Sequence, residues 1–146
     1  MYRFYNEKIA ISQIFKLGFI AIVLFVFYVQ FHGKVSPGGG FQSGIVMAIL
    51  LIAYELLVFL FEDKKRELSD MFFVYVAALG VFVYAFTGIA CFIFGGDVFD
   101  YSVLHKNVVL GRQIGIFCIE SGVGLGVFGS MMVIYRSLML NLKKQI

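Results

Sequence analysis

Two glutamates are the residues of this 146-residue chain best suited to chemistry, because each interrupts a long apolar segment. Glu55 lies within residues 41–61, and Glu120 lies within residues 113–135. A charged side chain at the centre of a bilayer costs about 2.5 to 3.5 kcal/mol on insertion scales, so such residues face protein or water and often serve ion or proton pathways. We expect no Lys or Arg deep enough in these segments to neutralise either carboxylate.

Two interpretations of these glutamates stay open. In the first, Glu55 and Glu120 transfer ions or protons. In the second, burial keeps each side chain protonated, and it only hydrogen-bonds across a helix interface.

The elements that carry these residues are expected to be membrane-spanning helices. The chain is 61% hydrophobic and 14% charged, and its mean hydropathy is +0.93, far from the balance of a soluble domain. A spanning helix needs about 20 mostly apolar residues, and four segments qualify: 15–31, 41–61, 71–95 and 113–135. The sequence predicts an all-α, polytopic fold with four transmembrane helices in a single membrane domain over residues 1–146. The first segment lacks a small-x-small cleavage site, and we expect it to remain as a span.

The distribution of basic residues predicts the orientation. Nine of the twelve Lys and Arg residues fall on the side of the termini, and three fall on the other side. The nine are Arg3, Lys8, Lys16, Lys64, Lys65, Arg66, Arg136, Lys143 and Lys144, and the three are Lys34, Lys106 and Arg112. By the positive-inside rule both termini are cytoplasmic. The net charge of +3 therefore reports topology, and we expect no nucleic-acid partner.

Small residues mark helix faces that are expected to pack closely. At about 100° per residue, Gly44, Ala48 and Glu55 share one face of the second segment. In the fourth segment the clustered glycines form a stripe of the small-xxx-small type, and Glu120 points roughly the opposite way. These glycines are Gly115, Gly122, Gly126 and Gly129. A helix that is occupied on both sides suggests either a partner protein or one curved bundle.

The only proline precedes three consecutive glycines, Pro37 to Gly40, at the start of the second segment. A short turn does not need three glycines, whereas consecutive glycines let another backbone approach very closely. We interpret this motif as a seat for another subunit, with a simple flexible turn as the alternative.

Other motifs give weak signals. Gly124, Gly126 and Gly129 match G-x-G-x-x-G, but they lie inside a span and not between a strand and a helix. His32 and His105 are poorly placed for haem, and Cys91 and Cys118 are interpreted as small apolar residues. We expect no metal and no cofactor. The outer loop 96–112 has room for a short interfacial helix anchored by Phe99 and Tyr101.

The residues around the glycine motif resemble a known signature. His32, Gly33, Pro37, Gly38, Gly39, Gly40, Phe41, Gln42 and Gly44 are similar to H-x-x-P-G-G-G-F-Q-x-G of the MnhB (MrpB) family, the B subunits of the Mrp (Mnh) multisubunit Na⁺/H⁺ antiporters. The fourth segment, with Gly115, Glu120 and Gly122, is similar to the last helix of that family. Four residues separate His32 from Pro37 here, so His32 fits the signature less closely than the glycines do.

The resemblance implies a non-autonomous, non-enzymatic, multi-pass subunit in a prokaryotic cell membrane. Its partners would be other subunits of a hetero-oligomeric complex and membrane lipid, with Na⁺ and H⁺ as the transported ions. Glu55 and Glu120 would contribute to an ion or proton path at a boundary between subunits, or only stabilise that boundary. The alternative is a membrane-arm component of a membrane-bound hydrogenase or related respiratory complex. A structural scaffold without an ion path, and a stand-alone channel, are the remaining hypotheses.

Overall fold

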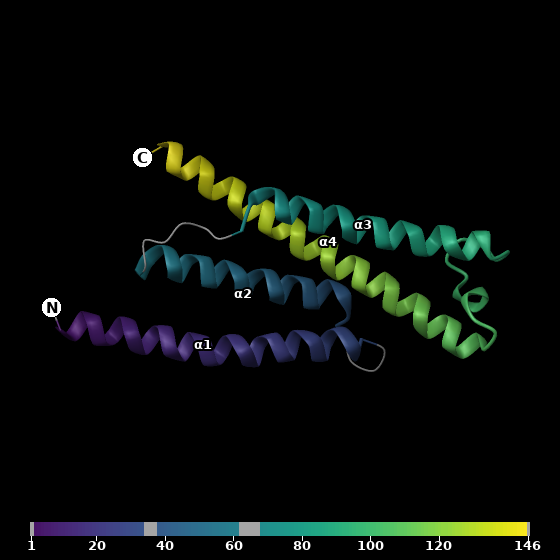
Figure 1. Ribbon diagram of the computed structural model, residues 1–146, viewed down its shortest axis with the longest axis horizontal. Helices are drawn as coiled ribbons and strands as arrows, with labels where there is room; N and C mark the ends of the chain where they lie inside the picture. The colour runs from purple at the N-terminus through teal and green to yellow at the C-terminus, as the bar shows by residue number, and fades with distance from the viewer. Residues whose placement is uncertain (1, 34–37, 62–67, 146) are drawn as a thin grey trace.

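The computed structural model describes residues 2–33, 38–61 and 68–145, and every regular element within them is helical (Figure 1). The elements are α1 (Tyr2–Phe31), α2 (Gly40–Phe61), α3 (Asp70–Ile93), the 3₁₀ turn η1 (Tyr101–Leu104) and α4 (Val108–Gln145). Four of these helices are long and apolar enough to cross a membrane. The prediction of an all-α fold with four spanning helices is therefore confirmed.

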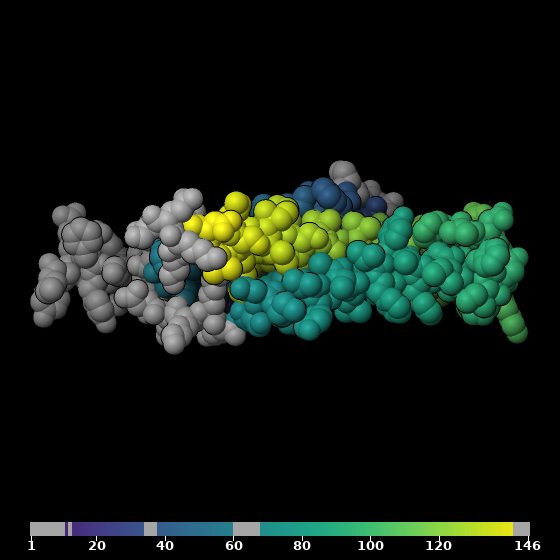
Figure 2. Space-filling view, turned by 90° about the horizontal axis from the view of Figure 1, so that it is seen from above, coloured from purple at the N-terminus to yellow at the C-terminus, as the bar shows by residue number. Residues whose placement is uncertain are grey.

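Helix α4 is the centre of the bundle. It packs against α3 on one side and α2 on the other, whereas α1 packs mainly against α2 and hardly touches α4. Figures 1 and 2 both show α3 next to α4, and Figure 1 shows α4 crossing α3 obliquely, with α2 on the other side of α4. Helix α1 begins and α4 ends at the same end of the bundle, and η1 lies at the opposite end (Figure 1). We call these two ends the terminal end and the loop end.

Local chemistry sets the bounds of α3. Ser69 precedes the helix, and its hydroxyl accepts a hydrogen bond from the Met71 N–H at 3.3 Å, as an N-cap residue does. At the other end Gly95 adopts φ +87°, the left-handed conformation that ends many helices. The N–H groups of Gly95 and Gly96 then donate to Phe92 O and Cys91 O, each at 3.1 Å. These bonds satisfy carbonyl groups that the helix end leaves free.

Glycines bring α3 and α4 into backbone contact. A Cβ atom placed on Gly80 would lie 2.6 Å from Gly122 O, and one placed on Gly129 would lie 2.6 Å from Ala77 N. Both distances are shorter than real Cβ contacts, so a side chain at either position would force the helices apart. This contact buries one face of α4, and the chain's own α2 covers the opposite face. The single-bundle interpretation thus accounts for an α4 that is packed on both sides.

The outer loop contains a short helical element, the 3₁₀ turn η1, and its aromatic residues face the protein. The Phe99 ring lies against Gly88 and 5.4 Å, centroid to centroid, from the Tyr84 ring. The Tyr101 ring lies against Gly115. Phe99 adopts φ +68°, a strained conformation for a bulky residue that only surrounding contacts can maintain. Both rings thus contact α3 or α4, although Phe99 is still 37% exposed, and their role as interfacial anchors stays a prediction.

Asp100 fixes the start of η1. Its carboxylate accepts hydrogen bonds from the Ser102 hydroxyl at 2.6 Å and the Ser102 N–H at 3.1 Å. These bonds favour the charged form, so they lower the pKa of Asp100 below its usual value. The turn packs against α4 and α3 at the loop end.

Candidate functional site

Glu55, near the terminal end of α2, forms a buried ion pair with Arg136 of α4. The Arg136 side chain is only 2% exposed, and that of Glu55 is 12% exposed. Arg136 also donates to the Asp70 carboxylate at 2.9 Å and to Leu68 O at 2.7 Å. Its guanidinium carbon lies 4.5 Å from the centroid of the Phe73 ring. One arginine therefore joins α2, α3 and the segment before α3.

The expectation that no basic residue would neutralise Glu55 is wrong. It placed the end of the fourth span at residue 135 and assigned Arg136 to the cytoplasmic tail. Helix α4 instead continues to Gln145, and its crossing against α2 and α3 carries Arg136 into the interface between the helices. A hydropathy pattern places the end of a span at the first charged residue, here Arg136. The helix itself continues past that residue and still packs against its neighbours.

Two buried atoms of this ion pair have no hydrogen-bond partner within the described part of the chain, namely Glu55 Oε2 and Arg136 Nε. Since Arg136 Nη2 already donates to Glu55 Oε1, the unpaired atoms are the two that a side-on, bidentate arginine–carboxylate contact would join. The Glu55–Arg136 contact is thus a buried ion pair made through Arg136 Nη2 and Glu55 Oε1.

Glu120, on the half of α4 nearer the loop end, has no such partner among residues 2–33, 38–61 and 68–145. Its carboxylate lies against the glycine turn before α2, because a Cβ atom placed on Gly33 or Gly39 would lie 2.8 Å or 3.2 Å from Glu120 Oε1. The residue is half-buried. Among the described residues no hydrogen bond or salt bridge is made by its side chain. This carboxylate is therefore half-buried and makes no hydrogen bond or ion pair within the described part of the chain.

The glycines of the turn are required by this contact. Gly39 adopts φ +84°, a backbone conformation that residues other than glycine rarely adopt. A Cβ atom on Gly40 would overlap the backbone oxygen of Glu120. The close backbone approach that the motif predicted is thus made to α4 of the same chain. Docking of another subunit at this motif stays a prediction, and Pro37 lies outside the described residues.

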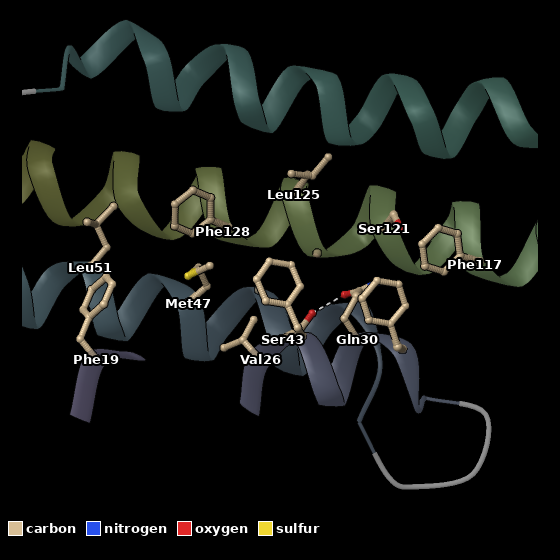
Figure 3. A pocket seen from close by; sticks show the side chains of 14 residues that line it. Phe19, Val26, Gln30, Ser43, Met47, Leu51, Phe117, Ser121, Leu125 and Phe128 are labelled. Carbon is tan, nitrogen blue, oxygen red and sulfur yellow. Dashed lines mark hydrogen bonds between the residues drawn. The ribbon is translucent and has the colours of Figure 1, made fainter. Parts of the chain in front are cut away.

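Glu120 opens into a groove of about 340 Å³ at the loop end. Its lining residues come from α1 and α4: Gln30, Phe31, Gln113, Ile114, Phe117 and Glu120. An adjoining groove of about 440 Å³ runs between α1, α2 and α4 toward the terminal end and is lined almost entirely by apolar side chains. We call these the polar groove and the apolar groove. Figure 3 shows Gln30 and Ser43 joined by a hydrogen bond at the end of the apolar groove nearest the α1–α2 connection.

The small-residue face of α2 lies against α4, as its periodicity suggested. A Cβ atom on Gly44 would lie 2.5 Å from Gly124 O, and Ala48 is fully buried. Gly124 thus faces α2 within the bundle, which excludes a nucleotide-binding turn for its G-x-G-x-x-G match. His32 lies at the end of α1 with its ring stacked on Tyr28, 4.3 Å between centroids. Phe41 and Gln42 are exposed, and Gly38 lies beside Val29.

Metal and disulfide chemistry find no support in residues 2–33, 38–61 and 68–145. No group of three His, Cys, Asp or Glu residues there is arranged to hold a metal ion. Cys91 is buried, Cys118 is partly buried, and both are free thiols.

The sequence did not indicate that Arg136 and Asp70 lie at Glu55, or that Gln30 and Gln113 lie at Glu120. One signal was present, since Gln113 and Glu120 are seven residues apart and so share a helix face. The other contacts join residues far apart in the chain, such as Arg136 and Asp70, which are 66 positions apart.

Comparison with known proteins identifies relatives. The model of a family described as "Domain related to MnhB subunit of Na+/H+ antiporter" matches residues 10–133. The chain is also 32% identical over 130 residues to the B subunit of the Na(+)/H(+) antiporter of Bacillus subtilis (strain 168), an alignment that covers 84% of this chain and 87% of that protein. No solved structure matches.

Proposed function

This chain belongs to the MnhB family of Na⁺/H⁺ antiporter subunits, and we propose that it is a non-autonomous subunit of a multisubunit monovalent cation/proton antiporter. Its four spanning helices agree with a multi-pass protein of a prokaryotic membrane. In this assignment the chain is a transporter subunit and not an enzyme. The termini would be cytoplasmic, as the distribution of Lys and Arg predicts.

The observation that carries the proposed role is the Glu120 carboxylate, which lines the polar groove and has no polar partner in the described part of the chain. An uncommitted acid within a membrane-spanning helix is a candidate for ion or proton transfer. Glu55 differs, because Arg136 neutralises it. We therefore assign proton or cation transfer to Glu120, and stabilisation of the helix bundle to Glu55.

The separation of the two acidic sites supports a subunit over a self-contained transporter. Glu120 and Arg136 are sixteen residues apart on α4, about 24 Å at 1.5 Å per residue. Between them the apolar groove presents Met47, Leu51 and Phe128. Since these side chains offer no ligand to an ion, this chain would supply one part of a path that other subunits complete. The groove between α1 and α4 would then lie at a boundary between subunits.

Antiport measured in inverted membrane vesicles tests the role of Glu120. The variants are Glu120→Gln, Glu120→Asp and Glu55→Gln, each in the complete complex with matched subunit yield. We expect Glu120→Gln to abolish most Na⁺-dependent proton movement, Glu120→Asp to retain part of it with a shifted pH profile, and Glu55→Gln to follow complex yield alone. A wild-type pH profile for assembled Glu120→Gln would rule out the transfer role.

The alternative of a hydrogenase or respiratory complex is not favoured, because the relative that matches is an antiporter subunit. Co-purification from native membranes separates the two. Large antiporter subunits without redox proteins would support the proposal, and hydrogenase or NADH-oxidising subunits would contradict it.

A further inference from the structure

We propose that the polar groove is a water-filled inlet that opens on the membrane side opposite the termini, passes Glu120 and ends at the Gln30–Ser43 pair. The lining and size of the groove support the inlet. The delivery of protons to Glu120 through this inlet rests on the proposed function.

The polar side chains of the groove form a line that descends from the loop end. Gln113 is exposed near the start of α4. Glu120 follows two turns later on the same face, about 10 Å deeper at 1.5 Å per residue. Gln30 lies one turn deeper still, because a Cβ atom on Gly124 would lie 3.3 Å from Gln30 Oε1. Polar groups at these three depths are what a column of water needs.

The Gln30 amide is the strongest indication of water. Its Nε2 atom is buried and has no partner in the described part of the chain. Its other polar atom is close to the Ser43 hydroxyl, which also lies 2.9 Å from Gly40 O. A hydroxyl has one proton, so Ser43 donates to only one of these two acceptors. Whichever way the amide is turned, one of its polar atoms lacks a protein partner, and buried polar groups of this kind are usually satisfied by water.

The polar groove is large enough for such a column. At about 30 Å³ per molecule in the liquid, its 340 Å³ has room for roughly ten waters. Three of its six lining side chains, those of Gln30, Gln113 and Glu120, can hydrogen-bond to them.

The same argument sets the end of the inlet. Beyond Ser43 the apolar groove is lined by Val26, Met47, Leu51 and Phe128 (Figure 3). Apolar cavities stay dry, because a water there would lack the two to four polar partners it needs. Water is therefore expected to stop at the Gln30–Ser43 pair, about one turn past Glu120. A proton that leaves hydronium in this column and bonds to a carboxylate oxygen of Glu120 leaves a neutral water behind, so one end of the column can load the acid.

Cysteine accessibility tests the inlet in the complete complex. The starting protein carries Cys91→Ala and Cys118→Ala, and its yield and antiport are checked first. Single cysteines are then introduced as Gln113→Cys, Gln30→Cys and Met47→Cys, and a charged, membrane-impermeant thiol reagent is added from the side opposite the termini. The matched control is Ala85→Cys, at an exposed position of α3. Its depth in the bundle is similar to that of the groove, because the neighbouring Tyr84 lies beside Gly122 of α4.

We expect Gln113→Cys and Gln30→Cys to react and Met47→Cys and Ala85→Cys to stay unmodified. Moving a charged reagent into hydrocarbon costs several kcal/mol, so the rates should differ by at least about 100-fold. Phe117→Cys lines the same groove and leaves Gln30 and Ser43 intact, so its reaction supports the inlet even if Gln30→Cys assembles poorly.

Three results would overturn the proposal. An unreactive Phe117→Cys and Gln30→Cys would show that water does not enter. Reaction of Met47→Cys at the rate of Gln30→Cys would remove the dry end. Reaction of Gln113→Cys only from the side of the termini would place the inlet on the wrong membrane face. Labelling as expected, combined with wild-type antiport in Glu120→Gln, would support the inlet and reject the transfer role of Glu120.

Discussion

Glu55 and Glu120 lie in opposite halves of the bundle, and the side chains around them differ. Around Glu55 the protein supplies a buried guanidinium, a second carboxylate and an aromatic face. Around Glu120 it supplies a glycine turn and an open groove. The residue type and the kind of helix are the same, so the difference lies in what the neighbouring helices provide. The two acids therefore differ in what they offer: Glu55 has a fixed cationic partner, whereas the Glu120 carboxylate faces a groove.

The comparison also separates two ways of bringing helices together. At the terminal end, a charged side chain joins α2, α3 and α4 through directional bonds. At the loop end, glycines let α2 and α4 meet through their backbones. The first contact should be sensitive to the loss of charge, and the second to the addition of volume.

The largest effect is expected from Arg136→Gln, which leaves Glu55 buried without its cation. Breaking a buried ion pair by removing one partner costs about 3 to 5 kcal/mol. We expect the variant protein to be lost from the membrane or from the complex, as measured by its yield and by thermal stability in detergent. The exposed Arg112→Gln, also on α4, is the control. Undiminished stability of assembled Arg136→Gln would show that the ion pair does not hold the helices.

A smaller effect is expected from Gly40→Ala. The added methyl group would collide with the backbone of Glu120, and overpacking of this kind costs about 1 to 3 kcal/mol. Thermal stability in detergent should fall, whereas Gly18→Ala should be neutral or stabilising, because nothing lies within 4 Å of that position in α1. Equal stability of the two variants would contradict the close contact between α2 and α4.

The smallest effect on stability is expected from Glu120→Gln. Its side chain makes no ion pair in the described residues, so the change should stay within about 0.5 kcal/mol. Glu55→Gln provides the contrast, because it weakens a charged hydrogen bond and should cost about 1.5 to 3 kcal/mol. Melting curves of the two purified complexes make the comparison. Equal losses would remove the distinction between a committed and an uncommitted carboxylate.

Sequence alone was sufficient for the features that depend on hydropathy and helical period. The four apolar runs predict the four helices, and the angle between Glu120 and the glycines predicts that they face different neighbours. Sequence was insufficient for Arg136 and Gln30, because their partners are 81 and 13 positions away in the chain and no local pattern encodes which helices meet. The outer loop shows the same limit, since the aromatic character of Phe99 and Tyr101 does not indicate whether they face lipid or protein.

The long separation between Glu55 and Arg136 has a consequence for biosynthesis. The arginine is made 81 residues after the glutamate, about 4 to 16 seconds later at 5 to 20 residues per second. During that interval Glu55 lacks the counter-ion that it has in the folded bundle. The ion pair can close only when the last helix arrives. The contacts that Arg136 makes with α2 and α3 therefore form only after α4 is complete. A chain truncated before residue 136 would lack them.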